Sequence, residues 1–163
     1  MCAAFISCAV NSKFRGDKDI YLSDSNINSL SGSFFCGDYK QASVLNHFSN
    51  DTIQVRAFSI SVIPISRNNI KLKFMKGDST FRELSLNGRL KRGYFKVNSK
   101  VSAVWVVGPL FWGLRHEARS LGLTKDNNLV VLNSSGGNAW ILFLPLLGSR
   151  GNYEREFKRV TIK

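Results

Sequence analysis

The stretch that decides the fold spans residues 70–97. It reads Ile-Lys-Leu-Lys-Phe (70–74), Lys-Gly-Asp (76–78), Leu-Ser-Leu-Asn-Gly-Arg-Leu (84–90) and Gly-Tyr-Phe-Lys-Val (93–97). Apolar and polar residues alternate, and turn residues break the alternation roughly every ten positions, as expected for short strands joined by tight turns. The stretch therefore predicts an antiparallel meander with one face on a core and the other, mostly Lys and Arg, in water.

Similar patterns predict further strands at residues 30–35, 52–65, 100–107, 119–123, 129–133, 139–144 and 153–162. Residues 124–128 and 134–138 are predicted turns, and the 108–113 segment, with glycine at both ends and a proline inside, is expected to interrupt the ladder. We therefore predict an all-β fold, an antiparallel up-and-down β-barrel of about eight strands, because closure removes the sheet edges. A β-sandwich is the alternative.

The chain is strongly basic. Its 163 residues carry 23 Lys and Arg against 11 Asp and Glu, a formal net charge of +12. This length favours one domain with a proper core. The charge favours a polyanionic partner, such as nucleic acid, anionic lipid or acidic glycan, and the alternative is a solvated basic surface with no such partner.

The N-terminus carries a candidate lipid-attachment residue. Residues 1–10 are apolar or small, and Phe5-Ile-Ser-Cys8 resembles the lipobox of bacterial lipoproteins. By that resemblance Cys8 would carry the lipid, residues 1–24 would be a signal-peptide remnant and tether, and residues 25–163 the β-barrel domain. Only seven residues precede Cys8, so this interpretation expects the reading frame to continue upstream. The alternative is a short apolar segment that docks on the barrel.

Other segments carry a wider resemblance. Residues 93–97, 111–115, 121–131 and 153–160 are similar to small bacterial envelope lipoproteins, and Leu30-Ser-Gly-Ser-Phe34 resembles the opening strand of lipocalin-like barrels. The resemblance implies export and a lipid anchor in the outer membrane or periplasm. It supplies no ligand and no catalytic residue.

The sequence shows no catalytic constellation. The two histidines, His47 and His116, lack partners at suitable spacing, because His116 and Glu117 are adjacent and point to opposite faces of an extended chain. The three cysteines have no metal-ligand spacing, and no nucleotide-binding or hydrolase motif occurs. We predict a protein that is not an enzyme and uses neither cofactor nor metal.

Basic residues supply the main binding hypothesis. Ten Lys or Arg and two acids lie between residues 67 and 100. We expect an outward anionic-surface site formed by Lys71, Lys73, Arg89, Lys91 and Arg92. For an anchored protein the nearest such surface is anionic lipid or glycolipid. The alternative is a solvated sheet face on which Lys blocks edge pairing.

Aromatic residues supply two further hypotheses. Trp105, Phe111 and Trp112 are expected to line or cover the barrel mouth and bind an apolar ligand, or to plug that end. Tyr94 and Phe95 among basic residues would suit a single-stranded nucleic-acid-binding barrel. Export argues against nucleic acid as a partner, and we expect a monomer.

Overall fold

The computed structural model describes residues 16–37, 45, 48, 57–98, 101–107, 111–141, 144–145 and 148–160. Within this part of the chain, one short 3-10 helix, η1 (Ile27–Leu30), accompanies eleven strands. The strands are β1 (Asp19–Ile20), β2 (Gly32–Cys36), β3 (Phe58–Ser66), β4 (Asn69–Lys76), β5 (Ser79–Lys91), β6 (Tyr94–Val97), β7 (Val101–Val107), β8 (Phe111–Thr124), β9 (Leu129–Ile141), β10 (Leu144–Pro145) and β11 (Ser149–Arg159).

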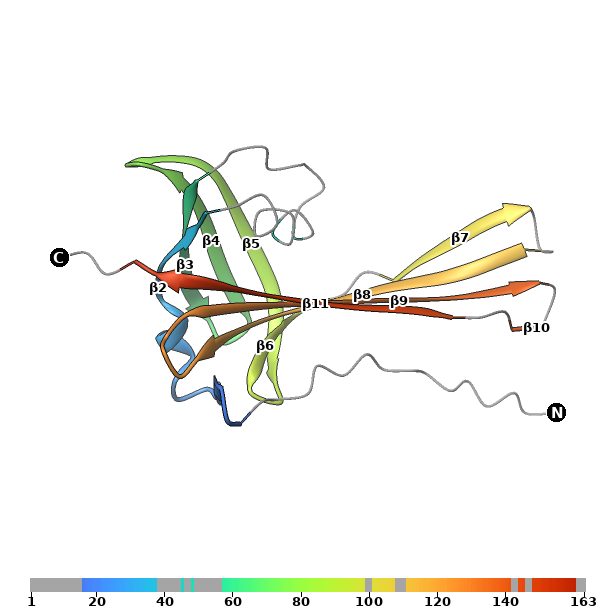
Figure 1. Ribbon diagram of the computed structural model, residues 1–163, viewed down its shortest axis with the longest axis horizontal. Coiled ribbons are helices and arrows are strands. Elements are labelled where there is room, and N and C mark those ends of the chain that lie inside the picture. Colours follow the sequence, from blue (N-terminus) through green and yellow to red (C-terminus); the bar gives the residue numbers. More distant parts are fainter. Residues whose placement is uncertain are drawn as a thin grey trace.

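Eight of the described strands close a ring. They follow the order β8-β6-β5-β4-β3-β2-β11-β9, and β9 pairs again with β8. Every pairing in the ring is antiparallel. The predicted all-β antiparallel, barrel-like fold is confirmed (Figure 1).

The meander that decided the fold lies in the ring as β4, β5 and β6. Ile70, Leu72 and Phe74 are buried, whereas Lys71 and Lys73 between them are only partly covered. The turn between β4 and β5 contains Gly77 with φ of 60°, a backbone angle that favours glycine. The period-two alternation therefore reports the inward and outward faces correctly.

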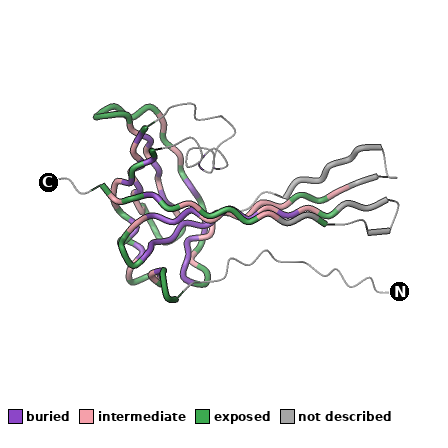
Figure 2. The backbone as a smooth tube through the Cα atoms, viewed as in Figure 1, coloured by how far each residue is buried: buried purple, intermediate pink, exposed green. Residues whose placement is uncertain are grey.

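The core fills the interior of the ring. Its largest members are Phe34, Phe74, Phe95 and Phe157, each fully buried, and buried residues concentrate in the body formed by the ring (Figure 2). Cys36 is also buried. These side chains come from every part of the ring, so its closure and its core are mutually dependent.

A long β-arm projects from the ring. Strands β8, β9 and β11 continue past it, and β7 and β10 pair with their extensions (Figure 1). We call this projection the arm, formed by β7, Phe111 to Glu117 of β8, Ser135 to Ile141 of β9, β10 and the first residues of β11. The sequence did not predict it.

The predicted turn at residues 134–138 is wrong, because these residues lie inside β9. Gly136 pairs with His116 on one side and Arg150 on the other, and Gly137 pairs with Arg115 and Ser149. Partners on both edges supply the hydrogen bonds that hold a glycine-rich segment extended. The predicted hairpin loop at 124–128 is confirmed between β8 and β9.

Residues 19–22, which lie within the segment expected to be a tether, pair with the ring. Asp19 and Ile20 pair with Thr124 and Leu123 of β8, and Leu22 bridges to Gly93. Asp19 is buried and accepts a hydrogen bond from the Tyr94 hydroxyl. Pairing with β8 and this buried contact hold residues 19–22 against the ring.

Strand β3 contains a proline, Pro64. The strand continues past it to Ser66, with a register irregularity between the two residues. A bulge lets a strand pass a residue that cannot donate to the ladder.

No helix in the described part of the chain is long and apolar enough to cross a membrane.

Candidate anionic-surface site at the β5–β6 hairpin

The β5–β6 hairpin carries four cations on a short length of backbone. Lys91 pairs with Tyr94, so the turn consists of Arg92 and Gly93 alone. Both have positive φ, 55° and 78°, as a two-residue turn of the primed type requires. Asn and Gly are the usual residues in this conformation, and arginine is uncommon there. The turn thus keeps an exposed guanidinium at its tip at some cost in backbone strain.

The four cations, Arg89, Lys91, Arg92 and Lys96, form what we call the hairpin cluster. Arg89 pairs directly with Lys96 across the two strands, an arrangement of like charges that destabilises a sheet. Burial lowers the pKa of the Lys96 ammonium from 10.5, and the nearby charges of Lys91, Arg92 and Arg89 lower it further. The cluster is therefore a region of positive potential whose internal repulsion an anion would relieve.

The two lysines of β4, unlike the hairpin cluster, form ion pairs with a carboxylate. The ammonium nitrogens of Lys71 and Lys73 lie 3.4 Å and 3.2 Å from the carboxylate oxygens of Glu83 on β5. The hydrogen bond from Lys73, together with the charges of both lysines, lowers the pKa of Glu83. Glu83 compensates part of their charge, which leaves them a weaker electrostatic attraction for an external anion.

The predicted anionic-surface residues thus divide into two groups. Arg89, Lys91 and Arg92 lie together in the hairpin cluster, whereas Lys71 and Lys73 pair with Glu83 on the neighbouring strand pair. Sequence reasoning missed Lys96. Its position opposite Arg89 follows from the two-residue turn, since Lys91 and Tyr94 flank that turn and the pairing continues outward from them.

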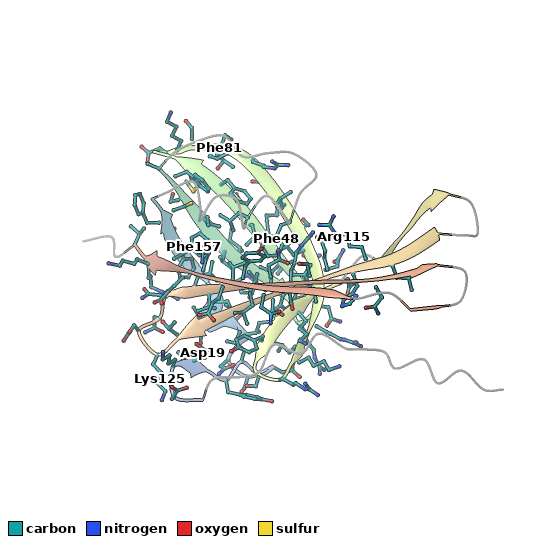
Figure 3. The ribbon with its side chains drawn as sticks, turned by 45° about the vertical axis from the view of Figure 1, so that its right-hand side comes forward. Asp19, Phe48, Phe81, Arg115, Lys125 and Phe157 are labelled. Atoms are coloured by element: carbon teal, nitrogen blue, oxygen red, sulfur yellow. The ribbon has the colours of Figure 1, made fainter. Side chains whose placement is uncertain are left out.

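The aromatic residues beside the cluster are not available for stacking. Tyr94 and Phe95 are both fully buried. A side chain added at Gly122 would meet the Tyr94 ring, with its Cβ 2.6 Å from Cδ1, so the ring covers this glycine. Figure 3 shows Asp19, the hydrogen-bond partner of Tyr94, on the same side of the molecule as Lys125. The pair ties the N-terminal strand to the ring and offers no face to a nucleobase.

A polar group lies where the arm leaves the ring. The Glu117 carboxylate accepts from Arg115 at 3.0 Å and from Arg119 at 2.6 Å, and the Arg119 guanidinium lies 5.7 Å from the centre of the Phe48 ring. Arg119 is in phase with the buried Leu121, so it covers the edge of the core. The Glu117 carboxylate is paired with two arginines, which makes it poorly suited to act as a base.

Two buried atoms of this region have no protein partner among the described residues. They are Nε of Arg119 and Oδ1 of Asn133, whose residues pair directly across β8 and β9. Nε2 of His116 is likewise buried without a partner. Sequence reasoning missed this polar group, because the local pattern does not show that charged residues of β8 are partly buried where the ring ends and the arm begins.

The remaining predicted sites fall outside what can be described in atomic detail. Cys8 lies outside the described residues, and so do the side chains of Trp105, Phe111 and Trp112, whose backbone belongs to β7 and β8 in the arm. The ligand-binding role of these aromatics stays a prediction. Among the described residues, no group of three or more His, Cys, Asp or Glu could hold a metal ion.

Comparison of the chain with protein-family models, with curated proteins and with solved structures finds no match.

Proposed function

We propose that this protein is a non-catalytic component of the bacterial cell envelope, anchored through a lipid on Cys8, which binds the anionic head groups of lipid or glycolipid through its hairpin cluster. The observation that carries the proposal is the strand register that places Arg89 opposite Lys96 and Lys91 and Arg92 at the adjoining two-residue turn, and the lowered pKa of Lys96 agrees with this grouping of four cations. Such a group costs stability in the free protein, and a bound anion would offset that cost.

The geometry favours a surface over an enclosed ligand. Arg89, Lys91 and Arg92 are exposed, and they lie on the outside of the ring at a turn. Each cation near an anionic membrane contributes about 1 kcal/mol to binding, and this contribution decays within a Debye length. A projecting turn brings several charges within that distance at once.

The first experiment measures co-sedimentation with vesicles of phosphatidylcholine containing anionic phosphatidylglycerol, at low salt. The variant combines Arg89→Gln, Lys91→Gln and Arg92→Asn, the last because Asn tolerates the turn conformation. Three charges at about 1 kcal/mol each predict roughly a hundredfold weaker binding. The control, Lys76→Gln, Lys125→Gln and Lys158→Gln, has the same net charge and should retain most of the affinity.

Equal losses in the two variants would overturn the assignment to the hairpin cluster, because net charge alone would then explain the binding. Tighter, salt-sensitive binding of the wild type to a single-stranded oligonucleotide than to these vesicles would favour nucleic acid instead.

The anchor is tested separately. In a bacterial host that expresses the full upstream reading frame, labelled fatty acid should enter the protein, and the mature mass should begin at Cys8. Cys8→Ala should abolish both. An unlabelled, unprocessed wild-type protein would overturn the anchor.

A further inference from the structure

All three tryptophans of the sequence occupy one cross-strand row of the arm. Trp105 of β7 pairs with Trp112 of β8, Trp112 pairs with Trp140 of β9, and Trp140 pairs with Pro145 of β10. Tryptophan is enriched where a protein crosses from water into lipid, because the indole ring has an apolar body and a polar N–H group. A row of three at one level of a projecting sheet matches a planar boundary.

The part of the arm that holds this row, from the arm's tip to residues 114 and 149, carries no formal charge. No Asp, Glu, Lys or Arg occurs from residue 101 to 114 or from residue 127 to 149. Charge returns where the arm meets the ring, at Arg115, whose side chain is 62% exposed, and at Arg150, which pairs with Gly136. Glu117 pairs with Arg115 at this base, so the base is charged but not purely cationic. A neutral end with a charged base follows the layering of a bilayer, in which charged groups lie outside the hydrocarbon.

The sequence at the end of the arm is also apolar at consecutive positions. Consecutive strand residues face opposite sides of a sheet, and Phe111 and Trp112 are adjacent, as are Trp140 and Ile141. The meander of the ring, by contrast, alternates Lys with apolar residues. Sheets whose strands are apolar throughout are buried on both faces.

We propose that the end of the arm inserts into a lipid bilayer, with the tryptophan row at the interface and Arg115 and Arg150 at the level of the phosphates. This inference adds a second contact to the membrane association proposed above, and it rests on different residues. It assigns the uncharged arm to lipid and the hairpin cluster to the charged head groups.

The strand edges set the depth of insertion. Among the described strands β7 pairs with β8 alone, so the other edge of β7 is unpaired. Open sheet edges are not tolerated in the hydrocarbon region, because their N–H and C=O groups find no partner there. A single copy should therefore stop at the interfacial layer, where water still reaches the edge.

The placement of the tryptophans makes the test direct, since their fluorescence reports on the arm alone. The probe is neutral phosphatidylcholine vesicles at high salt, which suppresses the contribution of the hairpin cluster. Emission should shift to the blue, and quenchers attached to lipid near the carbonyl groups should act more strongly than quenchers near the bilayer centre. The paired variant Trp112→Ser and Trp140→Ser should lower partitioning about tenfold or more, whereas Trp112→Phe with Trp140→Phe should retain most of it.

Wild-type quenching depth does not depend on how any variant folds, and circular dichroism checks that the variants keep the ring. A blue shift that depends on protein concentration and not on vesicles would overturn the inference, because a second copy would then cover the arm. Unchanged emission with vesicles would overturn it too. Binding to anionic vesicles at low salt, lost in the hairpin-cluster variant, would remain in either case if the proposed function is correct.

Discussion

The ring and the arm are built from the same strands yet solve the burial of apolar surface differently. Strands β8, β9 and β11 run through both regions (Figure 1). In the ring, they turn residues such as Leu121, Val131 and Phe157 toward a shared core. At the end of the arm, the extensions of β8 and β9 carry no charged residue and have adjacent apolar residues, Phe111 and Trp112 in β8 and Trp140 and Ile141 in β9. A ring encloses its own apolar face, whereas a projecting sheet with two apolar faces must bury them against another surface.

The largest expected effect is on the ring core. Phe74→Ala removes a fully buried ring that contacts Phe58 and Phe81, and it should lower the free energy of unfolding by about 3–5 kcal/mol. In urea unfolding, circular dichroism follows the strands of the whole molecule, most of which belong to the ring, and tryptophan fluorescence follows the arm. The two transitions should coincide, because continuous strands join the regions.

Phe81→Ala is the matched control, since Phe81 contacts Phe58, as Phe74 does, and the Phe74 ring itself, but is 41% exposed. It should cost clearly less than Phe74→Ala. A fluorescence transition at lower urea than the circular dichroism transition would show that the arm unfolds independently, against the expectation.

Two glycines, Gly88 and Gly137, compare how tightly the backbone packs in the ring and in the arm. A Cβ at Gly88 would lie 2.2 Å from the carbonyl oxygen of Lys96, whereas a Cβ at Gly137 would lie 3.5 Å from that of Leu114. Gly88→Ala should therefore force the β5 and β6 backbones apart and cost about 2 kcal/mol. Gly137→Ala should be neutral or gain up to about 1 kcal/mol through the unfolded chain. Thermal unfolding compares them, and equal costs would mean that the glycine-rich start of the arm is as tight as the ring.

Arg159 tests the end of the ring opposite the arm. Its guanidinium donates to the carbonyl oxygens of Ser29, Ser31 and Asn127 and lies 5.0 Å from the centre of the Phe34 ring. Arg159→Lys cannot reproduce this fork and should cost about 1–2 kcal/mol in chemical denaturation. Arg155→Lys is the control, because the Arg155 hydrogen bond is to its neighbour Glu154. Equal stabilities of the two variants would show that the fork contributes nothing.

The smallest effect concerns the hairpin cluster. Because the pKa of Lys96 is lowered in the folded protein, its charged form opposes folding at pH values below that pKa. The penalty disappears as the pH rises toward the unfolded value of 10.5. Lys96→Gln should therefore raise Tm slightly at neutral pH, and the difference should shrink in alkaline buffer.

Lys71→Gln should have the opposite sign at neutral pH, because it removes a partner of Glu83. A Tm of Lys96→Gln below that of the wild type at neutral pH would contradict the account of the cluster as electrostatically strained.

The ring was accessible from the sequence and the arm was not. In residues 70–97 each strand is short and one-sided, and its turns are marked by Gly77 and Gly93, so local pattern and final pairing agree. Residues 134–138 consist of small residues and glycine that suit a turn equally well. They become strand only because β8 and β11, distant in sequence, flank them on both sides.

Part of the candidate site could be predicted from the sequence and part could not, for the same reason. Arg89, Lys91 and Arg92 stand out in the sequence as a local concentration of charge. The pairing of Lys71 and Lys73 with Glu83, and the place of Lys96 opposite Arg89, depend on strand register. Outward-facing residues can be identified from alternation, but which of them have compensating neighbours cannot.

The seam between β2 and β11 also has a kinetic consequence. Ring closure requires Phe34 and Phe35 to meet Arg159 and Lys158, and the bond from Arg159 to Ser31 joins residues 128 positions apart. Contacts so distant along the chain form slowly, because the loop must close before the contact contributes any energy. During synthesis the ring therefore cannot close until β11 has emerged from the ribosome.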